Sequence, residues 1–76
     1  MSNIPSLKAR EVLEILFWAG FEKVRTSGSH IRLVKGQLRV TVPYHGKGTI
    51  PTGTLRSIVR QSGTTVDQFL AYRRKE

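Results

Sequence analysis

One histidine at the start of an alternating strand pattern has neighbours suited to acid–base chemistry on a phosphate. His30 lies in the stretch TSGSHIRLV, between a Ser-Gly turn and alternating apolar and polar residues. An imidazole titrates near ~6.5, so at neutral pH it can accept or donate a proton. Nearby cations could hold a phosphodiester and stabilise the charge of its transition state. The combination predicts metal-free cleavage of RNA, because a ribose 2′-hydroxyl can attack the adjacent phosphate and DNA has no such group.

The charge of the chain is strongly positive and unevenly distributed. Its 76 residues contain 13 Lys and Arg against 5 Asp and Glu, which gives a net charge of +8. No acidic residue lies between Glu22 and Asp67, whereas eight basic residues do. Such uncompensated cations favour a polyanionic partner, and nucleic acid is the partner class we expect. A second interpretation stays open, because basic strand faces also keep small proteins soluble.

The candidate RNA contacts are the basic and polar residues expected around His30. If the apolar residues of the strands face the helices, strand alternation directs most of these side chains to the opposite face. The predicted contacts are Lys23, Arg25, Ser29, Arg32, Arg39, His45 and Lys47. Tyr44, beside the basic loop, is the better candidate for stacking on a base, whereas Trp18 is expected in the core.

The second imidazole, His45, has two open interpretations. It could supply the second acid or base, or it could be a loop residue bonded to backbone in a Gly-rich turn. No carboxylate is near either histidine and the chain has no Cys, so we expect no metal site and no cofactor. The run GKGTIPTGT lacks the spacing of a nucleotide-binding P-loop, although Lys47 and its backbone amides could bind a phosphate.

The first half of the chain predicts one helix and three strands. Apolar residues at three- and four-residue spacing predict a helix over about residues 6–19, capped by Ser6, with Phe17 on the apolar stripe. The period then changes to two, which predicts three short strands joined by turns at Ser27-Gly28 and at residues 35–37. The residues expected to face the helices are Val24, Ile31, Leu33, Leu38, Val40 and Val42.

The second half predicts two more helices. Leu55, Ile58 and Val59 share one face of a helix that Gly63 ends, and Thr65 with Gln68 forms a capping box for the last helix. The whole pattern predicts an α+β fold of the order α-β-β-β-α, with helices on one face of a three-stranded antiparallel sheet. We expect one domain over residues 1–76. The longest apolar run, residues 15–19, is far short of the ~20 residues that span a bilayer, so we expect a cytoplasmic protein without membrane contact.

Three stretches of the sequence together resemble one family. AGFEKVRTSGSHIRLV, VTVPYHGKGTIPTGTLRSIVRQSG and TVDQFL are similar to the HicA-type mRNA interferase toxins of bacterial toxin–antitoxin pairs. The resemblance implies a fold like that of double-stranded RNA-binding domains. It also implies that His30, the histidine of Gly-Ser-His, is the catalytic residue for ribosome-independent cleavage of mRNA. A cognate HicB-type antitoxin that binds the toxin and masks its active site is the implied partner.

Two other functions compete with a toxin endoribonuclease. A non-catalytic double-stranded RNA-binding module would grip phosphates with its loops and helix ends, and His30 would be only a contact. A DNA-binding regulator is the weaker alternative, because the second helix offers few base-reading side chains beyond Arg56, Arg60 and Gln61. Cleavage of single-stranded mRNA separates the toxin from both.

Overall fold

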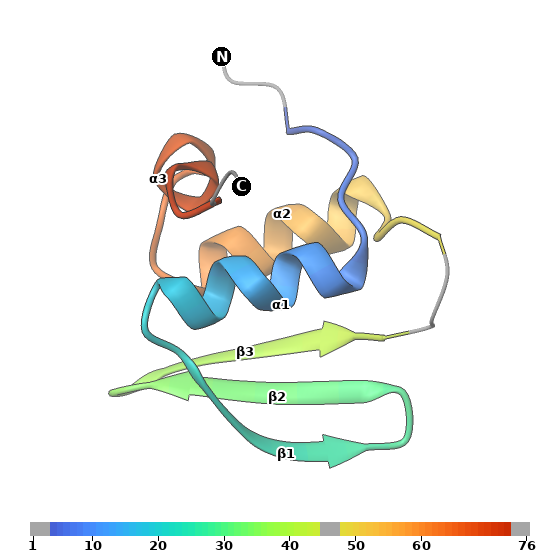
Figure 1. Ribbon diagram of the computed structural model, residues 1–76, viewed down its shortest axis with the longest axis vertical. Helices are drawn as coiled ribbons and strands as arrows, with labels where there is room; N and C mark the ends of the chain where they lie inside the picture. The colour runs from blue at the N-terminus through green and yellow to red at the C-terminus, as the bar shows by residue number, and fades with distance from the viewer. Residues whose placement is uncertain (1–3, 45–47, 74–76) are drawn as a thin grey trace.

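Six elements follow one another along the chain (Figure 1). In the computed structural model, which describes residues 4–44 and 48–73, they are α1 (Ala9–Trp18), β1 (Glu22–Ser27), β2 (His30–Lys35), β3 (Leu38–Pro43), α2 (Thr52–Gln61) and α3 (Val66–Ala71). The strands form one antiparallel sheet in the order β1-β2-β3. The predicted α+β class and its α-β-β-β-α order are confirmed. No helix in the described part of the chain is long and apolar enough to cross a membrane.

Glycine sets both turns of the sheet. Ser27 pairs with His30 around Gly28-Ser29, and Lys35 pairs with Leu38 around the next two-residue turn. Gly28 and Gly36 have φ angles of 58° and 60°, a left-handed backbone that costs a side-chain-bearing residue energy. Glycine at the first position of a two-residue turn matches the right-handed twist of the strands on either side. Both predicted turns are therefore present, and the first makes His30 the opening residue of β2.

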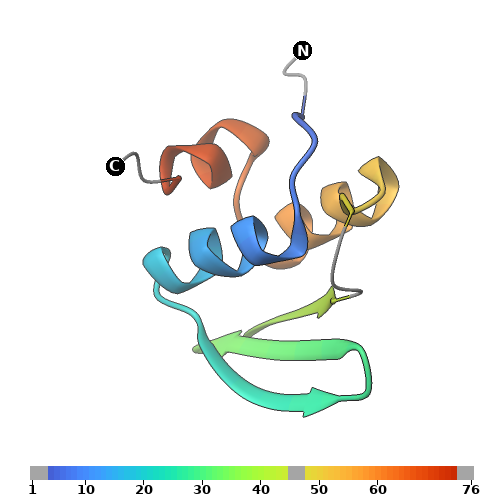
Figure 2. The same cartoon turned by 45° about the vertical axis from the view of Figure 1, so that its right-hand side comes forward.

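The helices lie on one side of the sheet and leave its other face open (Figures 1 and 2). Both α1 and α2 contact β3, whereas α3 packs against α2 on the side away from the sheet. The fully buried side chains of Leu33, Val40 and Val42 point from the sheet into the core. Because successive strand residues point to opposite faces, the residues between them form the open face.

β1 departs from the alternation that the sequence predicts. All six of its residues are exposed, and the pairing with β2 slips at a bulge between Lys23 and Arg25. The extra residue is Val24, which is 53% exposed, so the prediction that it faces the core is wrong. Leu38 faces the helix side as predicted, since its side chain lies beside Gly63 after the end of α2, although it is 38% exposed next to the turn.

α1 begins later than predicted. Ser6 does not cap it, because the two residues after Ser6 are held extended: Ile50 N–H donates to the Leu7 carbonyl at 2.8 Å, and Lys8 bridges to Thr49. The Glu11 carboxylate instead accepts from the Lys8 N–H at 2.8 Å. The helix thus starts at Ala9, and its first turn is anchored to the segment before α2.

The buried face of α1 also differs from the prediction. It consists of Ala9, Val12, Ile15 and Leu16. Phe17 and Trp18 are 46% and 40% exposed. The prediction that these two side chains are buried is therefore wrong. Trp18 follows Leu16 by two positions, a rotation of about 200° around the helix, which carries its side chain away from the core.

The last two helices follow their sequence signals closely. Leu55, Ile58 and Val59 are buried on α2, which starts three residues before Leu55. The Gln68 N–H donates to Thr65 Oγ1 at 3.1 Å, and the Thr65 N–H donates to Gln68 Oε1 at 3.0 Å. This reciprocal pair is the predicted capping box, and it begins the helix that carries Phe69 into the core.

Candidate active site

The β1–β2 turn brings His30 opposite a hydroxyl. Ser27 ends β1, His30 begins β2, and the two are direct partners across the strands. On the other side of β2, His30 pairs with Pro43. Paired residues share a sheet face, so these three form a row across the open face at the end of the sheet next to the turn. His30 is exposed, as a group that meets a substrate must be.

A second row on the same face contains two arginines. Arg32 pairs with Arg25 of β1 and with Thr41 of β3. This row lies two residues along β2 from His30, a separation of about 6.6 Å at the usual rise of a strand. Neither arginine forms an ion pair with an acidic residue in the described ranges.

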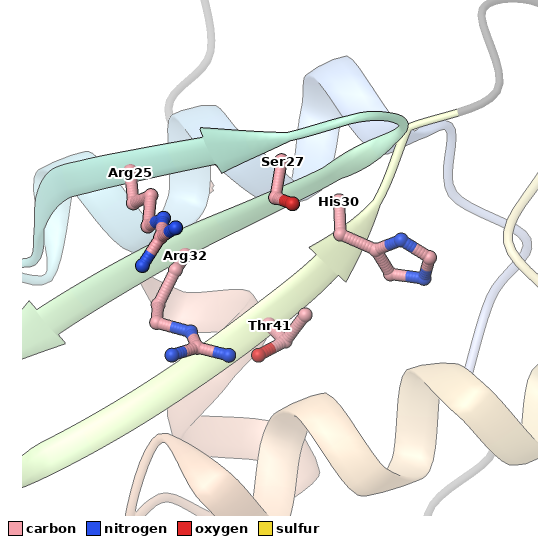
Figure 3. A pocket seen from close by; sticks show the side chains of 5 residues that line it. All are labelled: Arg25, Ser27, His30, Arg32 and Thr41. Carbon is pink, nitrogen blue, oxygen red and sulfur yellow. The ribbon is translucent and has the colours of Figure 1, made fainter.

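The two rows enclose a pocket of about 250 Å³ (Figure 3). It is lined by Arg25, Ser27, His30, Arg32 and Thr41. The five side chains come from all three strands and project from the same face of the sheet, with the His30 imidazole directed away from the two guanidinium groups. The pocket thus combines a group that can transfer a proton with two hydroxyls and two cations, groups that are suited to bind a phosphodiester and to catalyse its cleavage.

α2 fixes the far side of the pocket. β3 is an edge strand, so the Thr41 N–H has no strand partner on its outer side. It donates instead to the side-chain oxygen of Gln61, at the end of α2, at 3.2 Å. This bond ties the strand that carries Thr41 to the helix layer and leaves the threonine side chain on the pocket side.

The predicted contacts separate into those that line the pocket and those that do not. Arg25 and Arg32 line it with His30. Lys23 does not, because the bulge pairs it with Leu33 and so turns it to the helix side of the sheet. Arg39 pairs with Val34 on the open face, one row beyond Arg32 and outside the lining.

The remaining predicted contacts lie at or beyond the turn. Ser29 is an exposed turn residue outside the lining, and its carbonyl accepts from the Tyr44 N–H. That bond holds Tyr44, 37% exposed, beside the residue that precedes His30. His45 and Lys47 lie outside the described residues.

Sequence reasoning missed two hydroxyl groups of the pocket. The sequence predicts Ser27 only as a turn residue, whereas the two-residue turn after it makes it the direct partner of His30. Thr41 is the second hydroxyl, and it is not among the predicted contacts. The signal for Ser27 was present in the Ser-Gly-Ser-His spacing, whereas Thr41 depends on the register of β3, which the sequence leaves unspecified.

A second hollow lies at the other end of the sheet and is less suited to chemistry. It encloses about 540 Å³ beside the β2–β3 turn, α3 and the end of α2. Its one charged lining residue, Lys35, already donates to the Ala19 carbonyl at 2.6 Å, at the end of α1. Within residues 4–44 and 48–73, no three His, Cys, Asp or Glu side chains come together in a way that could hold a metal ion.

The region that builds the pocket identifies the family. Residues 9–64, which include α1, the sheet and α2, match the model of a family described as the HicA toxin of bacterial toxin-antitoxin. The chain belongs to the HicA toxin family. Among curated proteins, none matches it. As a HicA toxin, it is one half of a toxin–antitoxin system and has an antitoxin as its partner, and the His30 pocket lies wholly within the matched residues.

Proposed function

We propose that this HicA toxin is an endoribonuclease that cleaves mRNA without a metal ion and uses His30 as its acid–base group. The observation that carries the proposal is the pocket itself, where the exposed His30 lies with two hydroxyls and two arginines that lack acidic partners among the described residues. RNA is the substrate class because the nucleophile in such a reaction is the substrate's own 2′-hydroxyl. The net charge of +8 would attract the polyanion.

The proposed reaction is a displacement at phosphorus in which the attacking 2′-hydroxyl loses a proton and the leaving 5′-oxygen gains one. The His30 imidazole takes the proton of the 2′-hydroxyl, and the 2′-oxygen forms a bond to the adjacent phosphorus. The bond from phosphorus to the 5′-oxygen breaks, which leaves a 2′,3′-cyclic phosphate on one fragment and, once a proton reaches the leaving oxygen, a 5′-hydroxyl on the other. Ser27, the direct partner of His30, is suited to donate a hydrogen bond to a non-bridging oxygen of the same phosphate. His45 is the candidate proton donor to the 5′-oxygen.

The antitoxin is proposed to be of the HicB type and to inhibit by covering the pocket. An acidic surface would exploit the charge that attracts RNA, since complementary fields speed association. Antitoxin and RNA would then compete for one face of the toxin's sheet. A toxin–antitoxin complex that still cleaves RNA at the full rate would contradict inhibition by occlusion.

The experiment that tests the nuclease compares two substrates of one sequence. A single-stranded RNA and its 2′-deoxy counterpart are incubated with purified toxin in the presence of EDTA, and the fragment ends are determined by mass spectrometry. The proposal predicts cleavage of the RNA alone, with 2′,3′-cyclic phosphate ends. Cleavage of both strands, or cleavage that EDTA abolishes, would refute the mechanism. Tight binding of duplex RNA without cleavage would instead favour a double-stranded RNA-binding module.

A further inference from the structure

The two arginines of the pocket form a like-charge pair in a position that normally disfavours one. Arg25 and Arg32 are direct partners across β1 and β2, where like charges destabilise a sheet. Neither has an ion pair with a described acidic residue. Opposite charges at such positions would stabilise the hairpin, whereas this pair would be stabilised by an anion between the two guanidinium groups. Planar guanidinium groups suit a phosphate particularly well, because each can donate two parallel hydrogen bonds.

An anion held between the two arginines would be separate from a phosphate at His30. The arginine row and the His30 row are two residues apart on β2, about 6.6 Å at the rise of a strand. The imidazole also points away from the guanidinium groups (Figure 3). That separation is comparable to one nucleotide step of an extended RNA backbone. One strand of RNA lying along β2 would place one phosphate at each row.

We propose that Arg25 and Arg32 bind the phosphate next to the scissile one, so that the pocket engages two consecutive phosphates of a single strand. This rests on the proposed nuclease function and narrows its substrate class. The Thr41 hydroxyl, on β3 directly opposite Arg32, is the third donor to the neighbouring phosphate. The preferred substrate then carries a second phosphodiester beside the cut, and a dinucleoside monophosphate is a poor substrate.

The test removes the charge of one phosphate at a time. The cut site of a short RNA is first mapped, and the linkage on its 5′ side or its 3′ side is then replaced by an uncharged methylphosphonate. The sugar at the replaced linkage is 2′-deoxyribose, and the reference substrate carries that sugar with an ordinary phosphate. For wild type, neutralising one of the two neighbours should lower kcat/KM by about 10- to 100-fold, the effect of losing charge-assisted hydrogen bonds.

Substitution of each arginine by alanine tests whether Arg25 and Arg32 bind the neighbouring phosphate. Arg25→Ala and Arg32→Ala should each lose less activity than wild type when that phosphate is neutralised, and the protein with both substitutions should cleave the charged and the neutral substrate at the same reduced rate. Arg10→Ala is the matched control, because it removes one exposed charge from α1, on the other side of the sheet, and it should discriminate as wild type does. If the arginine variants still lose the same factor on neutralisation as wild type, the arginines do not bind the neighbouring phosphate and the proposal is wrong.

A binding measurement separates this inference from the nuclease proposal. Pyrophosphate is titrated into wild type, His30→Ala and the two arginine variants, and the thermal midpoint is followed at constant ionic strength. The inference predicts the same rise for wild type and His30→Ala and a smaller rise for Arg25→Ala and for Arg32→Ala. If wild type cuts no RNA but shows this pattern, the nuclease proposal fails and the anion site stands. An equal response from all four proteins would overturn the anion site.

Discussion

The bulge in β1 gives two valines of the sheet opposite energetic roles, and this difference can be measured. Val40 is fully buried in the core, whereas Val24 lies at the bulge and is 53% exposed. The alternation of the sequence alone places both against the helices, so only the structure separates them. Val40→Ala and Val24→Ala are therefore a matched pair in chemistry and differ in burial.

The magnitudes follow from the methyl groups that each change removes. Val40→Ala withdraws two buried methyl carbons at about 0.8 kcal/mol each and leaves a cavity, so it should lower the free energy of unfolding by about 2–3 kcal/mol. Val24→Ala should lower it by less than about 0.5 kcal/mol, as for most exposed positions. A domain of this size has about 4–11 kcal/mol in total, so the first loss is a large share.

Thermal unfolding followed by circular dichroism measures both. A loss of 1 kcal/mol moves the midpoint of a small domain by about 4–8 °C, so Val40→Ala should lower it by about 8–24 °C and Val24→Ala by about 4 °C or less. Equal losses would refute the bulge. Val24 would then face the core, Lys23 would return to the open face, and the site would contain a cation that the present account excludes.

Three further predictions concern the turn, the last helix and the charge. Gly28→Ala should lower the free energy of unfolding by about 1–2 kcal/mol, because a residue with a side chain disfavours a φ of 58° even where no atom crowds it. The control, Gly53→Ala in α2, should leave that free energy unchanged or raise it by up to about 1 kcal/mol. A Gly28→Ala protein as stable as wild type in urea would contradict the turn geometry. Thr65→Ala should cost about 1 kcal/mol by loss of its capping bond to Gln68, and an unchanged urea midpoint would contradict that cap. RNA affinity should fall linearly with salt on logarithmic axes, with a slope of about −0.7 per neutralised phosphate, and fluorescence anisotropy that shows no salt dependence would remove phosphate binding as its source.

The sequence predicts the elements of this fold better than the exact faces of its residues. Gly28, Gly36 and the Thr65–Gln68 pair act through local backbone geometry, so their roles can be recognised in a single chain. The prediction for Val24 is wrong because a bulge depends on the pairing of two strands, which the sequence does not show. The prediction for Trp18 is wrong because Trp18 follows Leu16 by two positions and so lies on the other side of the helix. The prediction that Ser6 caps the first helix is wrong because contacts with a segment distant in sequence decide the conformation there: Leu7 and Lys8 pair with residues 49–50 and are held extended.

The candidate site was predictable in its chemistry and less so in its membership. His30, Arg25 and Arg32 came from residue type and alternation, and these three line one pocket. Thr41 joins them only through the register of β3 with β2. Lys23 does not line the pocket, because the pairing of β1 with β2 shifts by one residue between Lys23 and Arg25. Strand alternation has a period of two, so such a shift reverses the face of every residue beyond it.

The most direct test of the central proposal is the cleavage of one defined single-stranded mRNA by wild type and by His30→Ala, with EDTA present. His30 is exposed, so the variant should keep its fold, and circular dichroism of both proteins checks this. Arg10→Ala serves as the control for handling and charge. Wild type should cut, and the folded His30→Ala protein should lose at least ~10²-fold in rate, as expected when a general acid–base group is removed. If the folded variant cuts as fast as wild type, His30 is not the catalytic group and the account is wrong.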